Sequence, residues 1–321
     1  MGFLELLAKI RTPLFDKIFL LITELGGQMA FIAIAVIIFW CFSKKDGYLL
    51  LSIGFIGIVV NQFLKLCFRV LRPWDLDPNF KAVPEAIPDA SGFSFPSGHT
   101  QNAVGIYGAL ATLAKSNLSR LIFLSLCIIV PFSRMYLGVH TPTDVGFSFF
   151  FAIFVIIVTK PIFNWAYKKT RNMFIFLGVM GVMAITFLLY VEVIFDPSTL
   201  PTEQMHNYIS AIKNAYLILG ALIGVLVAYP IEKYLVKFKE SGKWYTQIIK
   251  SLIGILLVLG LLEGLKLPLN AIFPEDTIAR AIRYFLVVVF VIAIYPLSFK
   301  LFNKLEVKIE EKRRKKKELK N

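Results

Sequence analysis

Long apolar blocks separated by short polar stretches run along almost the whole chain. Most blocks are nearly free of charge, and with their margins each approaches the roughly 20 residues that a helix needs to cross a bilayer core. We expect about nine spans, near residues 27–43, 48–67, 97–115, 119–136, 143–165, 173–194, 209–231, 246–266 and 279–302. The pattern therefore predicts an all-α protein, a polytopic transmembrane helix bundle.

The polar stretches divide the chain into four predicted parts. Residues 1–26 mix apolar with charged side chains, which predicts an interfacial or re-entrant helix. Residues 27–170 are expected to form a core of spans, and residues 171–303 an accessory transmembrane bundle. Residues 304–321 form a densely basic tail, which either binds anionic headgroups or, in the plainer interpretation, only fixes the topology.

Composition agrees with a membrane protein and changes how the charge is interpreted. The chain is 57% hydrophobic, whereas soluble domains average about 45–50%. Its net charge of +14 would suit a nucleic-acid-binding protein. Lys and Arg, however, lie mostly between the apolar blocks, as in short cytoplasmic loops. We therefore expect the lipid bilayer and no nucleic acid as partner, a multi-pass location in the cell membrane, and a cytoplasmic tail.

Three polar clusters interrupt the apolar pattern on the predicted non-cytoplasmic side. In the first, Lys65 and Arg72 are seven residues apart, about two helical turns, so they are predicted to share one helix face. Pro73 is predicted to end that helix. Taken alone, the pair could simply be two cations that extend to the lipid headgroups.

The second cluster, Phe95-Pro96-Ser97-Gly98-His99, directly precedes a predicted span. Ser97 is well placed as an N-cap, and a helix N-terminus beside a glycine is a ready anion site. A plain capped helix would leave His99 unexplained, because an ionisable residue at a membrane edge is costly without a task.

The third cluster runs from Ser133 to Asp144. Arg134 closes one predicted span, and Thr141 and Pro142 are expected as N-cap and first residue of the next. Asp144 could then merely complete a capping box. Alternatively, it accepts the proton of one ring nitrogen of His140 and leaves the other nitrogen free as a nucleophile.

The three clusters together supply cations, a helix N-terminus, two histidines and a carboxylate. Phosphoryl transfer to a histidine needs such a set, because cations and N–H groups stabilise the charge on the phosphoryl oxygens. One histidine would attack phosphorus while the other protonates the leaving oxygen. No carboxylate-rich metal site is apparent, so we expect no metal and no cofactor.

The spacings Lys-x6-Arg-Pro, Pro-Ser-Gly-His and Ser-Arg-x5-His-x3-Asp resemble the three-part signature of the type-2 phosphatidic acid phosphatase superfamily. The resemblance covers roughly residues 10–165 and implies a lipid-phosphatase helical core. It implies that His140 is the nucleophile, Asp144 its orienting partner and His99 the general acid. The residues that it assigns to the phosphate are Lys65, Arg72, Ser97, Gly98 and Arg134.

The predicted activity is metal-independent hydrolysis of a membrane lipid phosphate or diphosphate, with polyprenyl diphosphate favoured, through a phosphohistidine on the non-cytoplasmic face. A lipid phosphotransferase, acting on a second lipid or sugar, and a phosphatidate or phosphatidylglycerol phosphate phosphatase remain alternatives. A non-catalytic membrane protein is least favoured, because unused charges in a membrane are expensive.

The second half of the chain carries no recognisable motif. We expect its spans to shape the lipid entrance or a homo-oligomer interface. Arg280 and Arg283 are three residues apart and could meet an anionic headgroup. The plainer interpretation is interfacial anchoring and pairing with Glu275 or Asp276. His206 is expected to be a surface residue.

Overall fold

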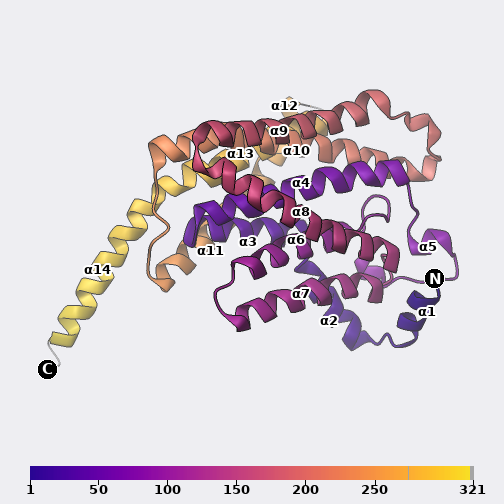
Figure 1. Ribbon diagram of the computed structural model, residues 1–321, viewed down its shortest axis with the longest axis horizontal. Coiled ribbons are helices and arrows are strands. Elements are labelled where there is room, and N and C mark those ends of the chain that lie inside the picture. The colour runs from indigo at the N-terminus through magenta and orange to yellow at the C-terminus, as the bar shows by residue number, and fades with distance from the viewer. Residues whose placement is uncertain (274, 319–321) are drawn as a thin grey trace. The chain divides into compact units, whose positions relative to one another are not determined.

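The computed structural model describes residues 1–273 and 275–318, and every regular element in these ranges is helical (Figure 1). The α-helices are α1 Gly2–Lys9, α2 Pro13–Glu24, α3 Gln28–Cys41, α4 Lys44–Phe68, α5 Pro73–Leu76, α6 Gly98–Leu113, α7 Asn117–Tyr136, α8 Pro142–Lys168, α9 Thr170–Leu189, α10 Met205–Ile231, α11 Trp244–Gly264, α12 Lys266–Ile272, α13 Asp276–Val289 and α14 Phe299–Glu318.

The predicted helical membrane bundle is confirmed, but the predicted count of nine spans is not reached. Among the described residues, seven helices are long and apolar enough to cross a bilayer, or eight if the bent pair α2 and α3 forms one span. Helix α6, at the expected span 97–115, has only 16 residues. At 1.5 Å per residue it is about 24 Å long, which is shorter than a hydrocarbon core of about 30 Å.

Helices α2 and α3 are bent by 47° at a short break. The bend is what a broken span or a re-entrant loop would show. The interfacial or re-entrant placement of residues 1–26 stays a prediction.

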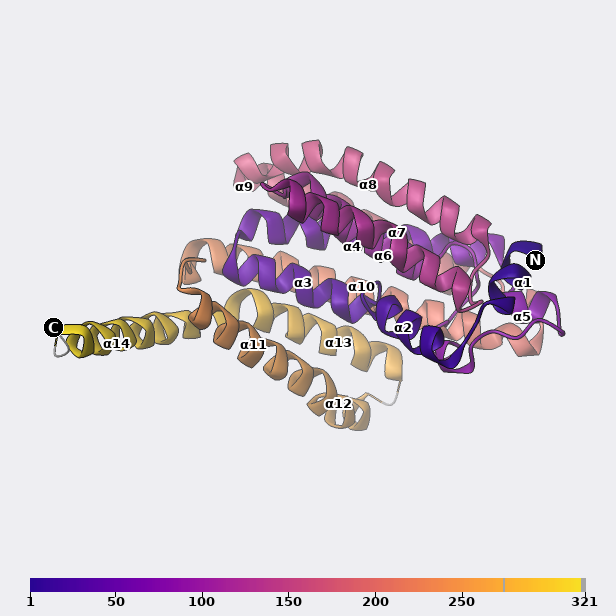
Figure 2. The same ribbon diagram turned by 90° about the horizontal axis from the view of Figure 1, so that it is seen from below.

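The chain folds as two compact units. Unit 1 comprises Met1–Ala35 and Tyr48–Ala215, and unit 2 comprises Val36–Gly47 with the described residues from Tyr216 onward. In unit 1, α6 packs against α7 and α8, α8 packs against α9, and α2 packs against α7 (Figures 1 and 2). Unit 1 contains all of the predicted site residues.

Polar N-caps start the helices that surround the predicted site. Ser97 caps α6 by accepting a hydrogen bond from the Thr100 N–H, as predicted. Thr141 caps α8, Pro142 is its first residue, and Asp144 completes a capping box with Thr141. The short polar segments before α6 and α8 therefore set where these two helices begin.

Arg11, in the link between α1 and α2, ties the N-terminal segment to the rest of unit 1. Its Nε donates to the Tyr136 carbonyl oxygen at 2.9 Å, and its Nη1 donates to the Lys81 carbonyl oxygen. Gly138 has a φ of +77°, and a Cβ there would lie 2.6 Å from Arg11 Nη2. A glycine at this position therefore allows both the left-handed turn before His140 and the close approach of Arg11.

Unit 2 contains α11 and α13, which pack against each other (Figure 2). On α13, Arg280 pairs with Asp276 at 3.6 Å, as the plainer interpretation of this arginine expects. Arg283 is buried, and its guanidinium lies over the Tyr284 ring at 5.9 Å from the centroid. A role for the two arginines at a lipid entrance stays a prediction.

Candidate active site

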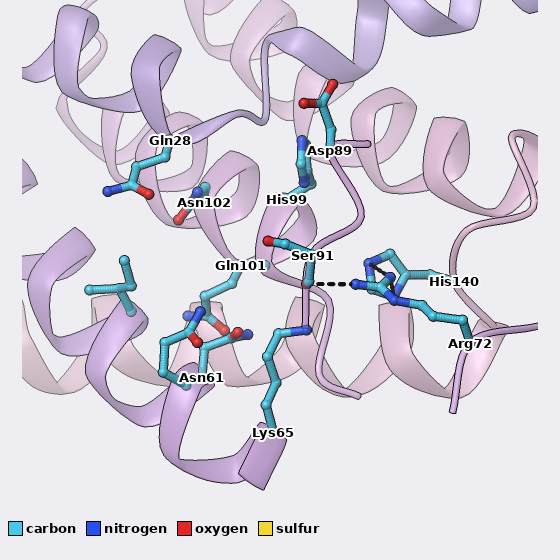
Figure 3. A pocket seen from close by; sticks show the side chains of 13 residues that line it. Gln28, Asn61, Lys65, Arg72, Asp89, Ser91, His99, Gln101, Asn102 and His140 are labelled. Atoms are coloured by element: carbon cyan, nitrogen blue, oxygen red, sulfur yellow. Dashed lines mark hydrogen bonds between the residues drawn. The ribbon is translucent and has the colours of Figure 1, made fainter. Parts of the chain in front are cut away.

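A cavity of about 240 Å³ opens in unit 1 at the N-terminus of α6 (Figure 3). Its walls come from α4, α6, the start of α3, the segment before α6 and the segment before α8. The lining residues are Gln28, Ile58, Asn61, Gln62, Lys65, Arg72, Asp89, Ser91, Gly98, His99, Gln101, Asn102 and His140.

The cavity gathers most of the residues that the sequence predicted for the site. Five of the eight line it: Lys65, Arg72, Gly98, His99 and His140. The other three are buried and do not line it: Ser97, Arg134 and Asp144. Lys65 and Asp144 are 79 positions apart in the chain, yet they lie close enough for their charges to interact. The fold thus brings distant residues into one region.

The predicted relation between Lys65 and Arg72 is wrong in one respect. Helix α4 ends at Phe68, and Arg69 has a φ of +50°, so the chain turns before it reaches Arg72. Pro73 does not end α4; it is the first residue of the short helix α5, where the fixed φ of proline fits. The two cations therefore reach the cavity from different segments.

Backbone carbonyl groups hold both cations in place. Lys65 Nζ donates to the Phe93 carbonyl oxygen. Arg72 donates to the Gly92 carbonyl oxygen at 3.1 Å, to the Ser91 carbonyl oxygen at 3.0 Å and to the Val139 carbonyl oxygen at 2.8 Å. The guanidinium is therefore positioned by the segment before α6 and by the residue before His140.

The neighbours of the His140 ring favour one of its two neutral tautomers. Arg72 Nη1 lies 3.0 Å from His140 Nε2 and 3.4 Å from Nδ1, so the arginine contact alone does not select a nitrogen (Figure 3). Asp144 Oδ2, which can only accept when ionised, lies 3.5 Å from Nδ1. A hydrogen on Nδ1 and a lone pair on Nε2 therefore suit both neighbours.

The charge state of His140 agrees with this tautomer. Burial lowers the pKa of His140 well below its usual value, and the positive charges of Arg72 and Arg134 lower it further. The ring is therefore neutral at neutral pH, so one of its two nitrogens carries a lone pair. A neutral imidazole with one nitrogen unprotonated is the form that acts as a nucleophile.

Asp144 completes the predicted capping box and also lies beside His140. Its Oδ2 accepts from the Thr141 N–H at 2.7 Å, which completes the capping box, and the same oxygen faces His140. Ser94 Oγ donates to this oxygen at 2.6 Å. The carboxylate is therefore fixed by two donors and cannot easily turn away from the imidazole.

Arg134 is completely buried at the end of α7. Its Nη1 donates to Thr23 Oγ1 of α2 at 2.8 Å. Its Nε and Nη2 have no hydrogen-bond partner among the described residues. A buried guanidinium with unpaired N–H donors can bind an anion through charge-assisted hydrogen bonds. Arg134 is not, however, among the residues that line the cavity.

The N-terminus of α6 contributes backbone donors to the same region. Ser97 Oγ accepts from the Thr100 N–H, and the first N–H groups of a helix have no partner within the helix. The positive end of the helix dipole lies here as well. Gly98 and His99, the first two residues of α6, both line the cavity.

Several residues in or beside the cavity wall were missed by the sequence analysis. Ser94, which holds Asp144, lies three residues before Ser97 in a segment where nothing marks it. The amides Asn61 and Gln62 in α4, and Gln101 and Asn102 in α6, do carry a signal, because polar side chains inside apolar helices need a reason to be there. His206 is exposed, as predicted.

The chain is similar in sequence to proteins of known family. The profile of the PAP2 superfamily matches residues 47–168. A second profile, "PAP2 superfamily phosphatase, transmembrane extension", matches residues 216–308. Phosphatidylglycerophosphatase B of Bacillus subtilis is 31% identical over 163 residues, which cover 46% of this chain and 76% of that protein. The chain belongs to the PAP2 superfamily.

Other PAP2 relatives also carry the names of phosphatases. Undecaprenyl-diphosphatase BcrC of Bacillus subtilis is 30% identical over 142 residues, covering 44% of this chain and 70% of that protein. A crystal structure of a transmembrane PAP2-type phosphatidylglycerolphosphate phosphatase from Bacillus subtilis shares 28% identity over 50% of this chain and 82% of that one, with a TM-score of 0.41.

Membership in the PAP2 superfamily makes the chain a multi-pass membrane enzyme, a lipid phosphatase. The second profile accounts for helices in the half of the chain where the sequence showed no motif, since it describes a transmembrane extension of PAP2 phosphatases.

Proposed function

We propose that the chain hydrolyses a membrane lipid phosphate or diphosphate through a phosphohistidine at His140, without a metal ion, on the non-cytoplasmic face. The observation that carries this proposal is the setting of His140. Its Nε2 lies 3.0 Å from Arg72 Nη1 at the cavity wall, while its Nδ1 faces a fixed carboxylate. This arrangement suits a nucleophile poised beside an anion site.

In the first step, the Nε2 lone pair of His140 forms a bond to phosphorus as the bond from phosphorus to the lipid oxygen breaks. Lys65 and Arg72 donate to the phosphoryl oxygens, whose charge they offset. The ring becomes cationic as the N–P bond forms, and the negative charge of Asp144 stabilises it.

His99 lines the same cavity and is proposed to move the protons. It donates a proton to the leaving lipid oxygen in the first step. In the second step it accepts a proton from water, whose oxygen bonds to phosphorus while the N–P bond breaks. His140 is regenerated, and inorganic phosphate leaves.

Fixed cations replace a metal ion in this proposal. Among the residues that the structure describes, no three His, Cys, Asp or Glu side chains are placed to hold a metal. Lys65, Arg72 and Arg134 supply positive charge instead, as cationic clamps do in phosphoryl transfer.

The distribution of charge along the chain supports a cavity on the non-cytoplasmic side. Loops rich in Lys and Arg and the basic tail are assigned to the cytoplasm by the positive-inside rule. The segment before α6 carries Asp75, Asp77, Glu85 and Asp89, which favours the opposite side for the cavity.

Two substrate classes are suggested by the relatives' names: phosphatidylglycerol phosphate by one, and an undecaprenyl diphosphate by another. Polyprenyl diphosphate, which the sequence analysis favoured, rests on the family resemblance. Both classes present a terminal phosphate on a membrane lipid.

Purified protein in detergent, incubated with a panel of lipid phosphates and diphosphates, tests the proposal. Phosphate release should be seen with the wild type and should disappear with His140→Ala. Release that persists in this variant would refute the assignment of the nucleophile. A phosphorylated product after addition of a second lipid or sugar would instead support a phosphotransferase.

A further inference from the structure

One part of the cavity wall is neither cationic nor apolar. Five neutral amide side chains line the cavity together with the charged groups (Figure 3). They are Gln28 of α3, Asn61 and Gln62 of α4, and Gln101 and Asn102 of α6. The proposed chemistry uses none of them.

The helices place this amide wall directly beside the phosphate-binding residues. Asn61 lies four residues before Lys65 on α4, so the two side chains share a helix face. Glycines make room between α4 and α6. A Cβ on Gly57 would lie 3.2 Å from Gln101 Nε2, and a Cβ on Gly98 would lie 3.8 Å from Asn61 Oδ1.

Two atoms of the amide wall are buried acceptors without a donor. Asn61 is 3% exposed, and its Nδ2 donates to the Pro96 carbonyl oxygen at 3.4 Å, which sets the orientation of the amide. Asn61 Oδ1 and, on the 4% exposed Gln101, Oε1 accept no hydrogen bond from any described residue. Because buried polar atoms are nearly always bonded in folded proteins, these oxygens point to a donor that the ligand brings.

The chemistry of that donor follows from the charges around it. A second phosphate group would bring more acceptor oxygens and negative charge against amide oxygens, near the carboxylate of Asp89, which also lines the cavity. A hydroxyl group would bring a neutral donor to an acceptor that lacks one. The positive charge of the cavity, on Lys65 and Arg72, is then left to a single phosphate.

We infer that Asn61 and Gln101 form a subsite for a hydroxyl-bearing head group, next to the transferred phosphate on its leaving-group side. The preferred substrate is accordingly a lipid phosphate monoester of a polyol such as glycerol, and a polyprenyl diphosphate is a poorer one. This inference rests on the proposed function, because it places the phosphate at His140.

A matched pair of substrates tests the subsite. Phosphatidylglycerol phosphate has a hydroxyl on the carbon next to the phosphate ester carbon, and its 2′-deoxy analogue lacks only that hydroxyl. We expect the wild type to favour the hydroxylated lipid by roughly tenfold or more in kcat/KM, because its loss leaves the subsite oxygens unpaired. A polyprenyl diphosphate, measured in the same micelles, should also fall below the hydroxylated lipid.

Two variants test whether Asn61 and Gln101 cause the preference for the hydroxylated lipid. In Asn61→Leu and in Gln101→Met, the kcat/KM ratio of the substrate pair should fall to about one to three. Asn172→Leu is the matched control, because Asn172 is also a buried asparagine of unit 1 but does not line the cavity. Its ratio should stay at the wild-type value.

Four results would overturn the subsite: a wild-type ratio near one, a ratio that both amide variants retain, a ratio that the control loses equally, or a polyprenyl diphosphate turned over faster than the hydroxylated lipid. If Asn61→Leu fails to fold, Gln101→Met and the wild-type ratio still decide. Added glycerol tests whether the hydroxyl belongs to an acceptor alcohol instead of the leaving group. If glycerol phosphate forms, and only when both amides are intact, the subsite binds an acceptor alcohol and the leaving-group assignment is wrong.

Different results would refute the proposed function. Phosphate release that survives His140→Ala refutes the nucleophile, and the substrate ratio is then still the measurement that decides the subsite. Release from no lipid at all overturns both proposals.

Discussion

Asp144→Asn separates helix capping by this carboxylate from its proposed electrostatic role at His140. The amide oxygen of asparagine can still accept from the Thr141 N–H and from Ser94 Oγ, so the helix cap survives. What disappears is the negative charge 3.5 Å from His140 Nδ1. The substitution therefore changes electrostatics and leaves the local fold in place.

The expected magnitude follows from the separation of the charges. At 3.5 Å and an effective dielectric constant of about 20, a carboxylate and a cationic ring attract each other by about 4–5 kcal/mol. That ring becomes cationic only as the N–P bond to His140 forms, so the attraction acts in the transition state. The loss corresponds to roughly a 10³-fold slower phosphorylation of His140.

Single-turnover labelling with a radioactive lipid phosphate measures this step directly, and thermal unfolding in detergent reports on the cap. Asp144→Asn should label roughly 10³-fold more slowly while its unfolding temperature stays near the wild-type value. Thr141→Ala is the matched control, because it removes the other half of the capping box and should cost about 1 kcal/mol of stability with kcat changed only a few-fold. Equal labelling rates in wild type and Asp144→Asn, or equal losses in both variants, would show that Asp144 only caps the helix.

The remaining predictions concern the other groups of the site and unit 2. His140→Ala should abolish covalent labelling by a radioactive substrate, and a labelled variant would refute the nucleophile. His99→Ala should slow hydrolysis by roughly 10²–10⁴-fold, with its first step rescued by a phenolate leaving group, whereas an equal loss on good and poor leaving groups would argue against a general acid. Activity should persist in excess EDTA and be inhibited by vanadate; loss in EDTA that Mg²⁺ or Zn²⁺ restores would refute the metal-free mechanism. Changing both Arg280 and Arg283 to Ala should raise KM for a long-chain lipid and leave kcat within a few-fold, which steady-state kinetics against a short soluble ester would check.

The helical class and the starts of α6 and α8 could be predicted because both depend on local rules. Apolar blocks of bilayer length predict membrane helices whatever they pack against. Ser97 and Thr141 cap α6 and α8 as predicted, because capping depends on residues within one turn.

What the sequence could not show depends on contacts between distant segments. The turn at Arg69 replaces the continuous helix predicted through Arg72, since a positive φ at a residue other than glycine has no local signature. Ser94 reaches Asp144 across 50 residues, and Asn61 meets Pro96 across 35. The length of α6 was overestimated by a few residues, because the expected span 97–115 included Ala114 and Lys115, whereas the helix ends at Leu113.

The hydrogen bond from Arg11 to the Tyr136 carbonyl oxygen connects residues 125 positions apart, so it also sets an order of events during biosynthesis. At roughly 5–20 residues per second, the ribosome needs about 6–25 s to reach Tyr136 after it has made Arg11. During this interval the turn that carries His140 has not yet been synthesised. The nascent chain therefore cannot pack this turn against the N-terminal segment until α7 has been synthesised, and the N-terminal segment lacks this partner for the whole interval.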